Sequence, residues 1–297
     1  MIGDYALFAS AEFKPMDALT IRPGVRYAYN TRYGAPLIPS LNVRWGLDHG
    51  FTLRASYAQG FRAPSLKELY FYFVDVNHDI VGNENLKAER SQSGNIGLNY
   101  RHAREKVVYT SEINGFYNDV NDLITLAQIQ GSQYSYVNIG RLRTAGGSVG
   151  AGWDNGHWIV SVGASITARR DVIADEHDEP WLLTHEVRGS LTREWRSKGW
   201  SGSLFWKYQG EQVNYVLATD GSVQRGSIQS FHMADASVSK QLWGKRLALT
   251  AGCKDLFDVQ NLNSTMSGGV HDGGETSVPM TTGRTFFMRV ELELKGK

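Results

Sequence analysis

The sequence has a single cysteine, Cys253, among its 297 residues. A disulfide within the chain is therefore excluded, and so is a metal site built from cysteine pairs. Lysine and arginine (31) nearly balance aspartate and glutamate (30), so no excess of positive charge favours binding to nucleic acid. No run of about 18 apolar residues occurs, which excludes a transmembrane helix. The first residues, interrupted by Asp4 and Glu12, lack the basic and apolar regions of a signal peptide.

What the sequence does contain is aromatic residues (11%) and glycine (32 residues), with only seven prolines. This composition suits strands and turns better than helices. Apolar and polar residues alternate along thirteen segments, as Val43 and Trp45 do with Asn42 and Arg44. A period of two is the pattern of a strand with one apolar face. We therefore predict an all-β protein of about thirteen antiparallel strands, with no long amphipathic helix.

The predicted connections between strands alternate between two lengths. Some are very short, such as residues 48–50 and 154–156, and others are long, such as residues 59–88, 119–133 and 258–282. Short turns at one end of an antiparallel sheet and long loops at the other are typical of a transmembrane β-barrel of the outer membrane. A soluble sandwich or propeller is the alternative, but no repeat of about 40–50 residues supports a propeller.

The two faces of the predicted strands differ in polarity. A barrel of this width is too wide for side chains to fill, so its apolar face must point outward to lipid and its polar face toward a wet lumen. Four charged residues on the polar series are predicted to line that lumen. They are Arg44, Glu112, Arg289 and Glu291.

An odd strand count does not fit a closed bacterial barrel, in which the number of strands is even. Together with the absent signal peptide, it predicts that residues 1–297 are one domain, the C-terminal portion of a longer protein.

Six segments resemble sequences found in TonB-dependent outer-membrane transporters, in the same order and at similar spacing. They are residues 60–70 (GFRAPSLKELY), 82–91 (GNENLKAERS), 116–124 (FYNDVNDLI), 136–140 (YVNIG), 249–258 (LTAGCKDLFD) and 283–287 (GRTFF). The resemblance implies a barrel of about 22 strands around an N-terminal plug. It follows that about nine strands and the plug domain are absent from this sequence.

The same resemblance implies a transport function without reaction chemistry. The chain would bind and translocate a scarce nutrient across the outer membrane of a Gram-negative bacterium, in the lipid bilayer, driven by the TonB–ExbB–ExbD system through the missing plug. No catalytic residue, metal site or bound cofactor is predicted, and a surface lipoprotein is a further partner that we consider.

The loop at residues 59–88 is the most informative about the ligand. Tyr70 and Tyr72 offer flat faces to a macrocycle, and His78 offers a nitrogen to haem iron. Arg62 is a candidate anchor for an anionic ligand, with an ion pair to Glu68 or Glu89 as the structural alternative. For His78 the alternative is a solvated loop histidine, and for the two tyrosines it is packing within the loop.

His271, flanked by glycine pairs in the last long loop, is a second candidate ligand residue. The predicted ligand is haem or another iron complex such as a siderophore, with cobalamin as the alternative within the family. Outside the family, an outer-membrane enzyme, a passive porin and a truncated, non-functional fragment remain open.

Overall fold

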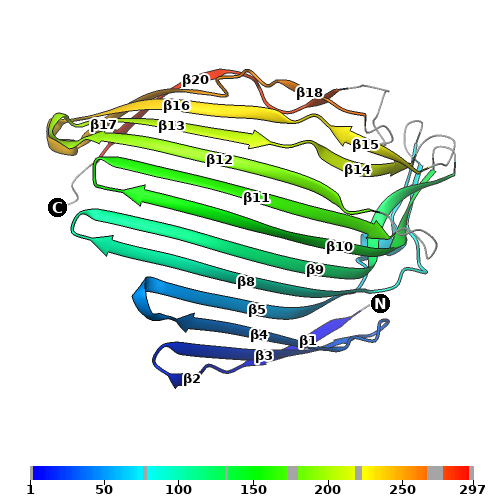
Figure 1. Cartoon of the computed structure of the whole chain (residues 1–297). Coiled ribbons are helices and arrows are strands. Elements are labelled where there is room, and N and C mark those ends of the chain that lie inside the picture. The colour runs from blue at the N-terminus through cyan, green and yellow to red at the C-terminus, as the bar shows by residue number, and fades with distance from the viewer. Residues whose placement is uncertain are drawn as a thin grey trace. The chain divides into compact units, whose positions relative to one another are not determined.

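The computed structural model describes residues 3–75, 79–130, 133–172, 180–217, 223–265 and 277–293. Within these residues, one large sheet contains a path of thirteen strands, each hydrogen-bonded to the next (Figure 1). Antiparallel pairing joins β1 to β3, β3 to β4, β4 to β5, β12 to β13, β13 to β16, β16 to β17 and β17 to β20. The strands of the path are β1 (Asp4–Ser10), β3 (Leu19–Asn30), β4 (Leu37–Gly46), β5 (Phe51–Arg62), β8 (Glu89–Arg104), β9 (Val107–Gln130), β10 (Gln133–Asp154), β11 (Trp158–Val172), β12 (Leu182–Trp195), β13 (Trp200–Gln209), β16 (Phe231–Leu242), β17 (Leu247–Lys254) and β20 (Thr285–Leu292).

The remaining elements decorate this path and are short. The extra strands are β2 (Phe13–Met16), β6 (Tyr72–Val74), β7 (Asp79–Val81), β14 (Gln212–Leu217), β15 (Val223–Ile228), β18 (Asn261–Asn263) and β19 (Ser277–Pro279). The helical elements are α1 (Leu66–Tyr70) and the 3-10 turns η1 (Asp48–Gly50), η2 (Arg196–Lys198) and η3 (Trp243–Lys245). Among the described residues, no helix is long and apolar enough to cross a membrane.

The predicted fold class and the thirteen principal strands are confirmed. The two short connections predicted at residues 48–50 and 154–156 are also confirmed, since η1 joins β4 to β5 and only residues 155–157 separate β10 from β11. The predicted long connection at residues 119–133 is wrong, because β9 continues to Gln130 and β10 begins at Gln133. The polar sequence of this segment predicts a loop. Strand pairing is made by backbone groups, so polar side chains do not prevent it. Here these side chains pair with one another, as Asp119 does with Arg141.

The chain divides into two compact units. Unit 1 comprises Met1–Leu98, Asn114–Gly146 and Ala168–Leu182, and unit 2 comprises Asn99–Ile113, Gly147–Thr167 and Leu183–Lys297. In unit 1, a small hydrophobic cluster of Leu69, Leu86 and Ile124 is buried, with Tyr136 packed against it.

In unit 2, strand register places apolar side chains on one continuous face. Leu204 of β13 pairs with Ala236 of β16, Ala236 pairs with Cys253 of β17, and Cys253 pairs with Phe286 of β20. This face is exposed: Phe286 retains 78% of its surface. An exposed apolar face of this extent is typical of a surface that another apolar phase covers.

Candidate functional site

Four of the segments that carry the family resemblance meet in unit 1. Three of them contribute one residue each to the buried cluster of Leu69 (1% exposed), Leu86 and Ile124. The fourth contributes Tyr136, which packs against that cluster. Segments separated by up to about seventy positions in the sequence therefore share one hydrophobic centre. Burying such residues contributes roughly 1.5–3 kcal/mol per side chain, which anchors the loop between β5 and β8.

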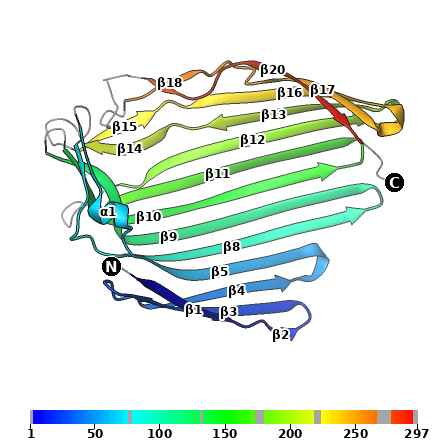
Figure 2. The same cartoon turned by 180° about the vertical axis from the view of Figure 1, so that it is seen from behind.

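The helix α1 has a capping box that fixes where the loop turns. The Ser65 hydroxyl accepts a hydrogen bond from the Glu68 backbone N–H (3.3 Å), and the Ser65 N–H donates to the Glu68 carboxylate (2.7 Å). The helix lies at the long-loop end of β9 and β10 (Figure 2).

Gly82 allows the chain to return past this helix. Its N–H donates to the Phe71 carbonyl, and a Cβ at this position would lie 2.7 Å from the carbonyl carbon and oxygen of Leu69. Since the contact is with backbone, only glycine fits without moving the helix.

Arg62, Glu68 and Glu89 form the charged part of the site. The Arg62 guanidinium donates to both Glu89 carboxylate oxygens (2.6 Å each) and to both Glu68 oxygens (2.9 and 3.0 Å). Glu89 is buried and also accepts from the Ile124 N–H (2.7 Å), so its charge is fully compensated. Burial raises the pKa of Glu68, but the Ser65 hydrogen bonds and Arg62 outweigh it and leave that pKa below its usual value.

Two asparagines attach the loop to β10. Asn83 donates to the Tyr136 carbonyl (2.9 Å), and Asn138 accepts from the Lys87 N–H (2.8 Å) and donates to the carbonyls of Lys87 and Asp122. The hydrogen bonds of Asn83 and Asn138 therefore fix the position of the loop relative to β10.

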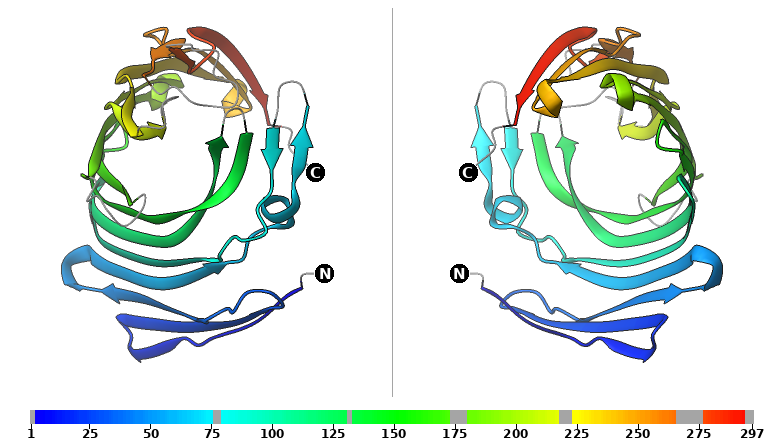
Figure 3. Two further views of the ribbon diagram at one scale, coloured as in Figure 1. Left: turned by 90° about the vertical axis from the view of Figure 1, so that its right-hand side faces the viewer. Right: turned by 90° about the vertical axis from the view of Figure 1, so that its left-hand side faces the viewer.

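The loop presents an aromatic edge, defined here as Tyr70, Tyr72 and Phe73. Tyr72 is 76% exposed, Tyr70 is 49% exposed and Phe73 is 41% exposed. β6, which carries Tyr72 and Phe73, pairs with β7, and β7 pairs in parallel with β10. Figure 3 shows these two short strands (cyan) beside each other and next to the coil of α1.

One cation contacts this edge, and a second contacts the neighbouring Phe71. Arg32 donates to the Tyr70 hydroxyl (2.6 Å) and to the Glu84 carbonyl, and the Lys67 ammonium lies 5.0 Å from the centre of the Phe71 ring. Neither Arg32 nor Lys67 was predicted from the sequence. The available signal was weak: Arg32 lies in the connection between β3 and β4, residues 31–36, at the same end of the strands as residues 59–88.

The structure places the predicted ligand residues as follows. Tyr70 and Tyr72 lie on the aromatic edge and are exposed, and Arg62 forms the ion pairs that were its structural alternative. The Arg62 side chain still keeps 45% of its surface exposed, so its role as an anchor stays a prediction. His78 and His271 lie outside the described residues.

The four predicted lumen residues lie on the polar series of their strands. Arg44 is opposite Thr20 and Arg54, and Arg289 is opposite Thr250. Arg289 and Glu291 are exposed and contact each other at 3.2 Å. Glu112 lines a hollow of about 450 Å³ in unit 2, together with Arg188. Their predicted exposure to a lumen stays a prediction.

The last two resembling segments meet in unit 2. The buried Asp255 accepts hydrogen bonds from the Val259 N–H (2.8 Å) and the Thr281 hydroxyl (3.0 Å), and Thr281 in turn accepts from the Gly283 N–H. Asp258 accepts from the Arg284 N–H (2.7 Å), and that bond lowers its pKa. Asp255 and Asp258 thus fix the course of the chain directly after β17 ends, as Asn83 and Asn138 fix the loop in unit 1.

Comparison with known proteins gives this arrangement a context. A model of the TonB-dependent receptor-like β-barrel matches residues 2–256. The ferrienterobactin receptor of Escherichia coli K12 is 23% identical over 281 residues, which cover 86% of this chain and 36% of the receptor. The chain thus spans about a third of that curated relative.

Solved structures agree on the fold. The siderophore receptor PirA from Pseudomonas aeruginosa has a TM-score of 0.70 at 17% identity, and the copper transporter OprC has a TM-score of 0.72 at 20% identity. Each alignment covers 98% of this chain and 48% of the solved chain. Because these two proteins are named for different cargoes, the shared fold alone does not specify what is carried.

Proposed function

The chain belongs to the TonB-dependent receptor-like β-barrel family, and from this premise we propose that it forms part of a transporter that takes up a ferric siderophore. Members of the family are outer-membrane proteins of Gram-negative bacteria, and this chain is assigned to the same membrane. They act as receptors and transporters, which favours uptake over an outer-membrane enzyme.

The observation that carries the proposal is the aromatic edge held in place by the resembling segments. Tyr70, Tyr72 and Phe73 supply exposed aromatic faces, Arg32 supplies positive charge at Tyr70, and Lys67 supplies it at the neighbouring Phe71. This combination suits an anionic iron complex with flat organic groups, since rings stack and cations pair with the negative charge. Two similar proteins are named a ferrienterobactin receptor and a siderophore receptor, which supports a siderophore as the cargo.

Haem and cobalamin are the alternative ligands within the family. The preference for haem depends on His78, which lies outside the described residues, and it stays a prediction, as do cobalamin and a surface lipoprotein. For the energy source, we propose the TonB–ExbB–ExbD system, acting through a plug in the whole transporter. We further propose that residues 1–297 are one portion of a larger barrel, since the chain covers 36% of one relative and 48% of another.

A direct test of the ligand is to add ferric enterobactin, haem or cyanocobalamin to the full chain in detergent micelles and to follow its fluorescence. We expect ferric enterobactin to bind most tightly. Replacing Tyr72 with alanine should weaken this binding by about tenfold, since one stacked ring is lost. Tyr109→Ala is the control, because Tyr109 is an exposed tyrosine of unit 2 (46%) away from the loop. Tighter binding of haem, or equal losses in the two variants, would contradict the proposal.

A further inference from the structure

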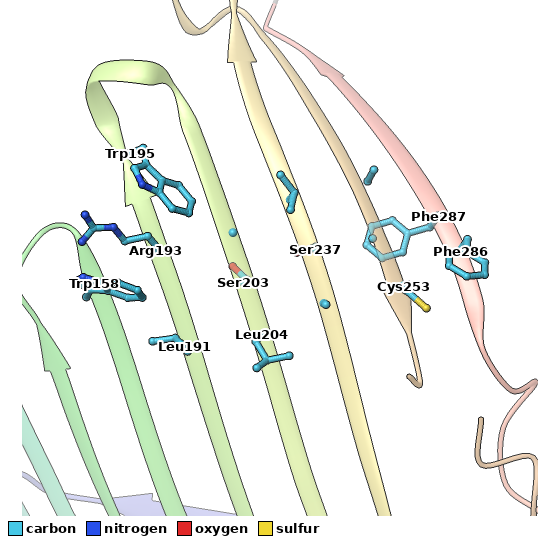
Figure 4. Close-up of a pocket in the computed structure, with 15 residues that line it drawn as sticks. Trp158, Leu191, Arg193, Trp195, Ser203, Leu204, Ser237, Cys253, Phe286 and Phe287 are labelled. Atoms are coloured by element: carbon cyan, nitrogen blue, oxygen red, sulfur yellow. The ribbon is translucent and has the colours of Figure 1, made fainter. Parts of the chain in front are cut away.

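A groove crosses the apolar face of unit 2 near the short-turn ends of its strands. It has a volume of about 750 Å³, and the small residues Gly202, Ala236 and Ala251 are among those that line it. Figure 4 shows the larger side chains around it. Leu191 and Trp195 border it on one side and Phe286 on the other. The strand register confirms a single face, because Gly202 pairs with Val238 and Val238 pairs with Ala251.

Arg193 lies on this apolar face at the groove. It pairs in register with Gly202, and its guanidinium lies 4.5 Å from the centre of the Trp158 ring and 5.8 Å from that of Trp195. Among the described residues, Arg193 has no carboxylate partner. A cation on the lipid face of a barrel strand is costly at the midplane of the bilayer and is tolerated near the interface, where anionic headgroups can pair with it.

A second cation, Lys240, and further tryptophans also lie near the short-turn ends of these strands. Lys240, two strands away on the same face, lies 5.0 Å from the centre of the Trp200 ring. Trp195 ends β12, Trp200 begins β13, and only η2 separates them. Tryptophan is typical of the membrane interface, and in outer-membrane barrels the short turns face the periplasm.

We propose that this groove binds an anionic phospholipid of the periplasmic leaflet, with an acyl chain over the small residues and the phosphate beside Arg193. The apolar floor suits the chain, and the unpaired guanidinium suits the phosphate, which it can contact through two parallel hydrogen bonds. Lys240 adds attraction for the negative headgroup. The inference rests on the outer-membrane location of the family and is independent of the cargo.

The test is native mass spectrometry of the full chain, stripped of lipid and titrated with dioleoyl phosphatidylglycerol or dioleoyl phosphatidylcholine. The two lipids share their acyl chains and differ in net charge. We expect the first phosphatidylglycerol to bind about tenfold more tightly than phosphatidylcholine, and Arg193→Gln to remove that preference. Arg196→Gln is the matched control, because Arg196 lies in the turn and contacts Glu194 at 2.8 Å.

A second variant tests the groove itself. A Cβ at Gly202 would meet the Trp195 ring at 3.7 Å, an ordinary contact, so Gly202→Leu fills the groove without straining the strand. It should weaken binding of both lipids by about fivefold or more, because the acyl chain loses its place. Gly189→Leu is the control on the same strand face as Arg193, where a Cβ would meet the Ser161 carbonyl at 3.7 Å.

Equal affinity for the two lipids, or a preference that survives Arg193→Gln, would overturn the proposal. So would a dimer of the chain that Gly202→Leu dissociates, because the groove would then bind a second copy. If Gly202→Leu does not fold, the comparison of Arg193→Gln with Arg196→Gln still decides the outcome.

Discussion

Glu89 is the residue on which the charge pairing of unit 1 converges. Its buried carboxylate accepts two hydrogen bonds from Arg62 and one from the Ile124 backbone, and so joins β5, β8 and β9. A buried ion pair adds little to the stability of the fold compared with a well-packed apolar pair. Removing one partner nevertheless destabilises the fold, because the other charge is left buried without a partner.

Replacement of Glu89 by alanine should therefore destabilise unit 1. We expect a loss of about 2–4 kcal/mol in the free energy of unfolding, less than for a fully buried pair because Arg62 can still contact water. The measurement is urea unfolding of the full chain in micelles. Glu211→Ala, an exposed glutamate outside the loop, is the control. Equal effects of the two substitutions would show that the ion pair contributes nothing.

Glu68 gives a pH dependence at the same scale. Because its folded-state pKa is lowered, its contribution to stability is complete above its unfolded-state pKa, about 4.3. That contribution is lost as the pH falls through the lowered folded-state value. We expect the urea midpoint of the wild type to fall more steeply below about pH 4.3 than that of Glu68→Gln. Parallel curves for the two proteins would contradict the assignment.

At the scale of elements, the short helix α1 and the returning segment at Gly82 depend on each other. A Cβ at Gly82 would meet backbone atoms of Leu69 and Phe71 at 2.7 Å, whereas a Cβ at Gly94 of β8 would meet nothing within 4 Å. We expect Gly82→Ala to displace α1 and to raise the rate of proteolytic cleavage within residues 60–88 about tenfold. Gly94→Ala is the matched control. Equal cleavage rates in the two variants would show that this close approach is not needed.

The sequence predicted the thirteen principal strands because their apolar faces alternate with period two, as Val43 and Trp45 illustrate. It could not predict that β9 extends past Asp119 to Gln130 and that β10 begins directly after it at Gln133, because polar side chains give no period-two signal even where the backbone pairs. The decorating hairpins, such as β14–β15, were also missed, since they are too short for a periodic signal.

The site could be predicted only in part, for a similar reason. Tyr70 and Tyr72 were identified because aromatic residues clustered in a long loop offer flat faces to a macrocycle, and the structure shows both side chains exposed. Arg32 was missed because its contact with Tyr70 joins residues 38 positions apart. No local pattern reports such a contact.

At the scale of the whole molecule, family membership and cargo rest on different evidence. The match over residues 2–256 shows the family, and the solved structures share the fold. We propose that the cargo depends on a few exposed side chains of the long loops, such as Tyr72, because loop residues can change while the sheet stays the same.

The measurement that tests the central claim most directly is accumulation of radioactive iron from ferric enterobactin by cells that carry the transporter with this chain in its barrel. The account predicts uptake that requires both TonB and the proton gradient and that falls by about tenfold in Tyr72→Ala, following the loss of binding. Uptake of equal rate in cells without TonB would indicate a passive pore, and the absence of any iron uptake while haem or cobalamin accumulates would contradict the proposed cargo.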